Sequence, residues 1–115
     1  MSVTTFRDIP HVLQLECSGE ALAPDTDVLT MAMYVSGSDT ILAYVNPWKN
    51  DCLTSDSFTS CIVVPNHSRK TRLRSLVLDV TEMTSRVYGC NVTFSRAGGW
   101  TSSVSWSLPV SGKSK

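Results

Sequence analysis

Two cysteines, Cys17 and Cys90, lie 73 residues apart, and their spacing constrains the fold more than any other feature. Cys17 closes a segment in which apolar and polar residues alternate, and Cys90 lies in a second apolar segment, two residues after Tyr88. Alternation with a period of two is typical of β-strands whose two sides face different surroundings. We therefore expect the two cysteines to face each other across two packed sheets.

The four cysteines of the chain allow three disulfide pairings. Their spacing favours Cys17–Cys90 together with Cys52–Cys61. In the chain-entropy description, closing the long loop stabilises the folded state by about 4.4 kcal/mol and closing the short loop by about 2.7 kcal/mol. Paired cysteines indicate an oxidising compartment, so we expect an extracellular protein, either secreted or part of a cell-surface ectodomain.

Two tripeptides agree with that compartment, because they fit the acceptor pattern for N-glycosylation: Asn66-His67-Ser68 and Asn91-Val92-Thr93. Glycans are therefore predicted at Asn66 and Asn91. The segment Met1–Asp8 has neither the basic start nor the apolar stretch of a secretion signal, and no segment approaches the roughly 20 apolar residues of a membrane span. We expect the signal and any membrane anchor to lie outside this chain.

At 115 residues, the chain is long enough for one hydrophobic core. We expect a single domain over residues 1–110 and a tail or linker over residues 111–115. With a net charge of +0, the chain lacks the excess of basic residues that nucleic-acid binding requires. The one basic cluster, Arg69-Lys70 with Arg72 and Arg74, is interpreted as a solvated strand end rather than an anion site.

Alternation continues along most of the chain and is interrupted by Gly, Pro, Asp and Asn. The segments 29–35 and 41–45 predict a hairpin, and 52–60 is polar and predicts an irregular segment held by the second disulfide. Strands are also expected over 62–64, 73–80, 87–94 and 104–110. About eight to nine strands without crossover helices predict an all-β, antiparallel fold.

The chain resembles the immunoglobulin superfamily on Cys17, the strand-like run before the second cysteine, Tyr88-Gly89-Cys90 and the closing hairpin. The extra segment 41–45 favours the variable-type set. The resemblance implies a β-sandwich of two antiparallel sheets, with two disulfides here. Leu42-Ala43-Tyr44-Val45 and Val87-Tyr88-Gly89-Cys90-Asn91-Val92 are further similar to domains of molluscan fibrinogen-related and lectin-linked immune proteins.

Several residues depart from the family pattern. The core Trp after the first cysteine is replaced by Met31 or Met33, and polarisable Met side chains suit an irregular core gap. Trp106 is expected to supply part of the lost bulk. The acidic residue expected six positions before the second cysteine is Thr84, and the Gly four positions before it is Arg86. These departures argue against an antibody or T-cell-receptor domain.

No constellation for catalysis is visible. His11 and His67 stand far from regular metal-ligand spacing, and there is no Cys-x-x-Cys, Gly-x-Ser-x-Gly, His-Glu-x-x-His or phosphate-binding glycine loop. Asp25 and Asp27 lack the Gly and distal Glu of a calcium loop, so a solvated loop is favoured. We therefore expect a non-enzyme with no cofactor and no metal.

Four aromatic residues are the candidate binding residues: Tyr34, Tyr44, Trp48 and Trp100. Tyr and Trp are the side chains that most often anchor protein interfaces. Alternation places both tyrosines opposite the core, on one sheet face, unless one of them packs on a neighbouring strand or domain. The tryptophans lie in turns, where Trp48 either binds a ligand or caps the edge of the core.

The same alternation turns Asn91 outward onto the face of the two tyrosines, so a glycan there would compete with a ligand. The leading function is an extracellular recognition module of an immune-type or self/non-self receptor, or of a secreted defence protein, that binds a protein or glycan ligand. The alternative is a homophilic adhesion domain or a structural spacer.

Overall fold

The computed structural model describes the chain except for residues 7, 9–10, 39, 79–84, 97–98 and 112–115. Its described part contains nine strands and two short 3-10 helices. Their bounds are β1 Ser2–Thr5, β2 Leu13–Ser18, η1 Gly19–Ala21, β3 Thr26–Val35, β4 Ile41–Asn46, β5 Asp51–Thr54, β6 Thr59–Ile62, η2 Ser68–Lys70, β7 Arg72–Val77, β8 Ser85–Arg96 and β9 Thr101–Ser111.

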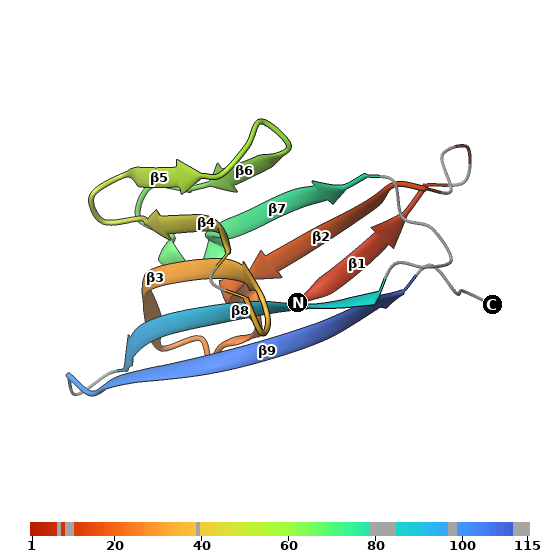
Figure 1. Ribbon diagram of the computed structural model, residues 1–115. Helices are drawn as coiled ribbons and strands as arrows, with labels where there is room; N and C mark the ends of the chain where they lie inside the picture. Colours follow the sequence, from red (N-terminus) through yellow and green to blue (C-terminus); the bar gives the residue numbers. More distant parts are fainter. Residues whose placement is uncertain (7, 9–10, 39, 79–84, 97–98, 112–115) are drawn as a thin grey trace.

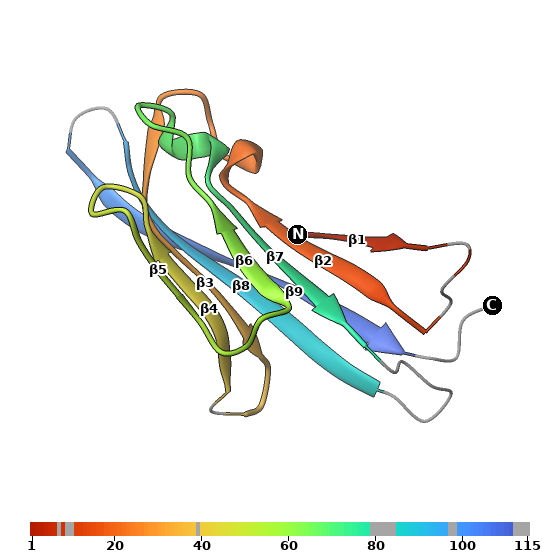
Figure 2. The same cartoon turned by 90° about the horizontal axis from the view of Figure 1, so that it is seen from above.

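The strands form two packed antiparallel sheets, which Figures 1 and 2 show from two directions. One sheet has the strand order β1-β2-β7-β6, and the other has the order β5-β4-β3-β8-β9. In the immunoglobulin lettering these are the ABED sheet and a GFC sheet extended by C′ and C″, which defines the variable-type sandwich. The predicted all-β, variable-type fold is confirmed.

Both predicted disulfides are present. Cys17 of β2 and Cys90 of β8 join the two sheets through the core, with their Cα atoms 6.1 Å apart. Cys52 of β5 and Cys61 of β6 join the sheets at one edge, at the same Cα separation of 6.1 Å.

The core lies between the sheets, around the Cys17–Cys90 disulfide. Met31 and Met33 are fully buried where the family pattern has a tryptophan. Trp106 stands opposite Cys90 in the β8–β9 register and packs, half-buried, against the core. Its bulk thus enters from the edge strand, as expected. Thr84 lies outside the described residues.

One expected segment differs from the structure. Residues 52–60 do not form a single irregular segment, because β5 pairs with β4 and β6 pairs with β7. Both strands are largely polar and lie at sheet edges. An edge strand is partly exposed to solvent, so it can form without the apolar alternation by which strands are predicted. The strand expected over 62–64 overlaps β6 only at Ile62, because β6 begins at Thr59 and ends at Ile62. The strand expected over 73–80 is β7, which ends at Val77.

Candidate functional site

The outer face of the β5-β4-β3-β8-β9 sheet is built from cross-strand rows of residues. One row crosses all five strands through direct register partners: Leu53, Tyr44, Ala32, Asn91 and Ser105. Residues two positions before and after each member of this row lie on the same face, because alternate residues of a strand point to the same side. We call this surface the sheet face.

A second row of the sheet face carries a close aromatic contact. Tyr34 stands opposite Ile41 on one side and Gly89 on the other. A Cβ atom built on Gly89 would lie 2.3 Å from Cζ of Tyr34, so the tyrosine ring lies directly on the glycine backbone. Only a residue without a side chain accommodates the ring in this position. Gly89 therefore holds Tyr34 flat across β8.

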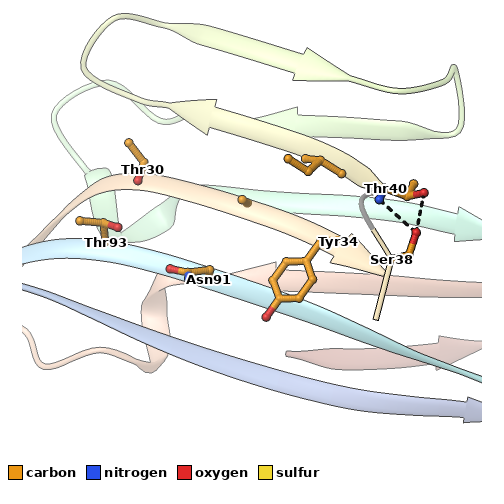
Figure 3. Close-up of a pocket in the computed structure, with 8 residues that line it drawn as sticks. Thr30, Tyr34, Ser38, Thr40, Asn91 and Thr93 are labelled. Carbon is orange, nitrogen blue, oxygen red and sulfur yellow. Dashed lines mark hydrogen bonds between the residues drawn. The ribbon is translucent and has the colours of Figure 1, made fainter. Parts of the chain in front are cut away.

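A shallow hollow of about 530 Å³ opens on this face. Figure 3 shows its side chains, which come from β3, from β8, from the start of β4 and from the turn between β3 and β4. The lining combines apolar groups with hydroxyls and one amide: Thr30, Ala32, Tyr34, Ser38, Thr40, Ile41, Asn91 and Thr93. None of these residues is charged. The hollow therefore suits a neutral, partly polar group.

The two tryptophans lie at one end of the sandwich, away from the hollow's lining residues. Register places the C-terminal ends of β4 and β8 beside the N-terminal part of β3, so the turns that follow both strands share that end. We call residues 19–25, 47–50 and 99–100 the loop end. These are the connections that correspond to the antigen-binding loops of variable-type domains.

Trp48 is held at the loop end by specific bonds. Its indole Nε1 donates a hydrogen bond to the carbonyl oxygen of Val28 at 2.8 Å. The Asn46 side chain accepts bonds from the backbone N–H groups of Trp48 and Lys49, which is a turn-forming arrangement typical of Asn. Trp48 is nevertheless 61% exposed, so its ring does not simply cap the core.

Trp100 follows Gly99, whose φ of +86° suits a tight hairpin turn. Trp100 is 75% exposed, more than any other large apolar side chain in the described part of the chain. Residues 97 and 98 of this turn lie outside the described residues.

The structure thus divides the four candidate residues into two groups. Tyr34 and Tyr44 lie on the sheet face, as alternation predicts, and Trp48 and Trp100 lie at the loop end. Three exposed apolar residues of the sheet face were not among the candidates: Ile41, 60% exposed, Leu53, 68% exposed, and Val87, 40% exposed. The alternation Asp51-Cys52-Leu53-Thr54 was the available signal for Leu53, and the polar surroundings obscured it.

The basic cluster lies on η2 and on β7 of the other sheet, and its two β7 arginines are paired with carboxylates. Arg74 Nε donates to Glu16 Oε2 at 3.0 Å, and Arg72 contacts both Glu16 and Glu20. The hydrogen bond and charge of Arg72 lower the pKa of Glu20, and the same contact raises the pKa of Arg72. Arg69 donates to the backbone carbonyls of Glu20 and Leu22. These bonds support the interpretation as a structural strand end.

The two glycosylation tripeptides have different surroundings. Asn66 lies in an exposed turn with a φ of +64°, beside Trp48 in a hollow of only about 40 Å³. Asn91 is half-buried within β8 and lines the sheet-face hollow. Within the described residues, no group of three His, Cys, Asp or Glu side chains is arranged to bind a metal ion. The helices described are also too short and polar to cross a membrane.

No protein-family model matches the chain, and no curated protein matches it in sequence. Among solved structures, 39 chains match, including a structure of murine CRIg. That match has a TM-score of 0.60 and 12% sequence identity, and it covers 90% of this chain and 86% of the CRIg chain. At this identity, the likeness shows a shared immunoglobulin-like, variable-type fold.

Proposed function

We propose that this domain is an extracellular, non-catalytic recognition module that binds a protein or glycan ligand through the loop end. The observation that carries the proposal is the pair of exposed tryptophans, Trp48 and Trp100, on two turns at the same end of the sandwich. Exposed Trp is unfavourable in water, and Trp is among the side chains that contribute most to binding energy.

Hydrogen bonds of both tryptophans support the same proposal. Trp48 is bonded to β3 through the Val28 carbonyl, and the backbone carbonyl of Trp100 accepts a hydrogen bond from the Arg96 N–H at 2.8 Å. An anchor that is already ordered loses less conformational entropy on binding. The disulfides support an extracellular setting, since they persist in oxidising compartments. The resemblance found in the sequence favours a self/non-self receptor or a secreted defence protein as the parent.

A second candidate function is homophilic adhesion through the sheet face. It is favoured by Ile41 and Leu53, two exposed aliphatic side chains beside Tyr34 and Tyr44. The face carries no charge in its central rows, so two copies would meet there without like-charge repulsion. A structural spacer is the remaining alternative, and it requires neither surface to bind.

Binding to an array of purified extracellular proteins and oligosaccharides tests the proposal, with the biotinylated domain presented as a tetramer. Every positive signal is then measured again with Trp100→Ala, Trp48→Ala and the sheet-face control Tyr44→Ala. We expect Trp100→Ala to weaken binding at least tenfold and Tyr44→Ala to leave it unchanged. Binding that tolerates loss of both tryptophans, or that needs Tyr44 instead, contradicts the loop-end proposal.

A further inference from the structure

The acceptor tripeptide in β8 has both of its chemical groups on the sheet face. Asn91 and Thr93 are two residues apart in a strand, so they point to the same side, and both line the hollow. The Asn91 side chain makes no hydrogen bond with the other lining residues in Figure 3, where the drawn bonds join Ser38 and Thr40. Among the lining residues, none therefore holds its amide in a hydrogen bond that would compete with a modification.

The neighbours of Asn91 are unusually small. Its direct partners are Ala32 on β3 and Ser105 on β9. The next outward residue along β8 on one side is Gly89, and on the other it is Thr93. A bulky group attached to Asn91 would thus find room above the sheet, beside the Tyr34 ring that covers Gly89.

The hollow beside Asn91 has the chemistry that a sugar ring requires. The ring of Tyr34 and the side chain of Ile41 offer an apolar wall, and the hydroxyls of Thr30 and Thr93 offer hydrogen-bonding groups. An aromatic ring combines a large apolar face with a polar tip, which suits the mixed surface of N-acetylglucosamine. The absence of charge among these lining residues favours a neutral sugar over an acidic one.

We propose that Asn91 carries an N-linked glycan whose first N-acetylglucosamine lies in the hollow against Tyr34, so that the glycan covers the sheet face. In the modification, the side-chain nitrogen of Asn91 attacks the anomeric carbon of an oligosaccharide carried on a lipid pyrophosphate. The new C–N bond replaces the C–O bond to phosphate. The lipid pyrophosphate leaves with the bonding electrons, and the amide nitrogen gives up one proton.

Asn66 provides the contrast. The hollow that it shares with Trp48 has about 40 Å³, against about 530 Å³ for the hollow beside Asn91. A sugar on Asn66 has no seat there and would project into solvent. A glycan seated on Asn91 therefore covers the sheet face specifically. The glycan would exclude ligands and second copies of the chain from the face of Tyr34 and Tyr44. A glycan-covered sheet face goes beyond the proposed loop-end function.

Occupancy is tested on the full chain secreted from a eukaryotic host, by intact mass before and after treatment with peptide N-glycosidase. We expect Asn91→Gln to remove the mass of one glycan and Thr93→Ser, which keeps the acceptor pattern, to retain it. Asn66→Gln reports the other site separately. If wild type and Asn91→Gln carry the same glycan mass, Asn91 is unmodified and the proposal is wrong.

Seating is tested by NMR after the glycans are trimmed to a single N-acetylglucosamine. We expect cross-peaks between the Asn91-linked sugar and the Tyr34 ring, and an upfield ring-current shift of its N-acetyl methyl signal. Tyr34→Leu should abolish the shift while keeping the glycan mass, and Tyr44→Leu, on the same face, should preserve it. If Tyr34→Leu is not secreted, the presence or absence of the cross-peaks in the wild-type protein tests the seating. A sugar without contact to Tyr34 contradicts the seating.

Discussion

The contact between Tyr34 and Gly89 is the most specific side-chain feature of the sheet face. Glycine weakens a strand because it adds backbone entropy to the unfolded chain and packs nothing. Here the ring of Tyr34 covers the position where a Cβ would otherwise stand. The tyrosine thereby supplies the packing that the glycine lacks. The contribution of each residue to stability therefore depends on the other.

This pairing predicts a coupled effect on stability. Gly89→Ala places a methyl group in the Tyr34 ring, so we expect the free energy of unfolding to fall by about 1 to 3 kcal/mol. In a Tyr34→Ala background, the same substitution should be neutral or stabilising, because alanine is favoured over glycine in a strand. Urea unfolding of the four proteins in the double-mutant cycle measures the coupling. Additive effects would contradict the ring-on-glycine contact.

The two tryptophans are predicted to differ in stability although both are candidates for binding. Trp100→Ala removes a side chain that is 75% exposed, so the free energy of unfolding should change by less than about 0.5 kcal/mol. Trp48→Ala removes the hydrogen bond to the Val28 carbonyl and should lower the free energy of unfolding by about 1 kcal/mol. Thermal or urea unfolding of both variants checks this. Trp100→Ala is thus the cleaner variant for binding experiments.

At the scale of elements, ion pairs connect β7 to β2 and to the start of η1. Arg72 bridges Glu16 and Glu20, and Arg74 bonds Glu16. All of these side chains are partly exposed, so solvent and salt weaken each pair. The network positions the strand end rather than supplying a large share of stability.

The lowered pKa of Glu20 predicts the sign of a pH effect. A carboxyl whose folded pKa is depressed stabilises the fold above its unfolded pKa, and the contribution is lost as pH falls through the folded value. Glu20→Gln should therefore be less stable than wild type at neutral pH, with a difference that shrinks as pH falls below the ordinary value of 4.5. Urea unfolding across pH measures it. The control Asp25→Asn removes an exposed loop carboxylate and should show no such loss. A difference that grows in acid would contradict the assignment.

The Cys52–Cys61 disulfide joins two short edge strands that make few other contacts with the core. Both cysteines have partly or largely exposed side chains, so replacing them creates little cavity. We expect the double variant Cys52→Ala/Cys61→Ala to remain folded and to lose about 2 to 3 kcal/mol of unfolding free energy, through the freed loop. A single cooperative urea transition would show that the fold is retained. No loss at all would mean that the bridge does not constrain the unfolded chain.

At the scale of the whole molecule, the sandwich is elongated, with extents of 47 × 27 × 22 Å. The long β8–β9 hairpin contributes to that length (Figure 1), and Trp100 directly precedes β9. A recognition surface at the loop end and a glycan on the sheet face can therefore coexist. The glycan would protect an otherwise uncharged and partly apolar face from self-association.

This arrangement predicts the oligomeric state. The secreted, glycosylated domain should sediment as a monomer at every concentration, because the glycan on Asn91 keeps two sheet faces apart. Sedimentation equilibrium measures it. A concentration-dependent dimer that is lost in Tyr44→Ala would contradict this expectation and favour the homophilic adhesion function instead.

Features that depend on local pattern were predictable. Alternation with a period of two placed Tyr34, Tyr44 and Asn91 outward, because adjacent residues of a strand must point to opposite faces. The spacing of Cys17 and Cys90 indicated two facing sheets, and the structure pairs them. The glycosylation sites and binding roles of these residues remain predictions.

Features that depend on register and on contacts between distant segments were not predictable. A register shift in the β3–β4 pairing, with Leu42 as the extra residue, puts Ile41 opposite Tyr34, and strand pairing brings Leu53 beside Tyr44. The Tyr34–Gly89 contact joins residues from separate strands, and the loop end gathers turns from separate parts of the chain. Each of these arises when strands select their partners, a choice made by packing across the whole domain. Alternation specifies which way a side chain points, whereas tertiary packing specifies what it meets.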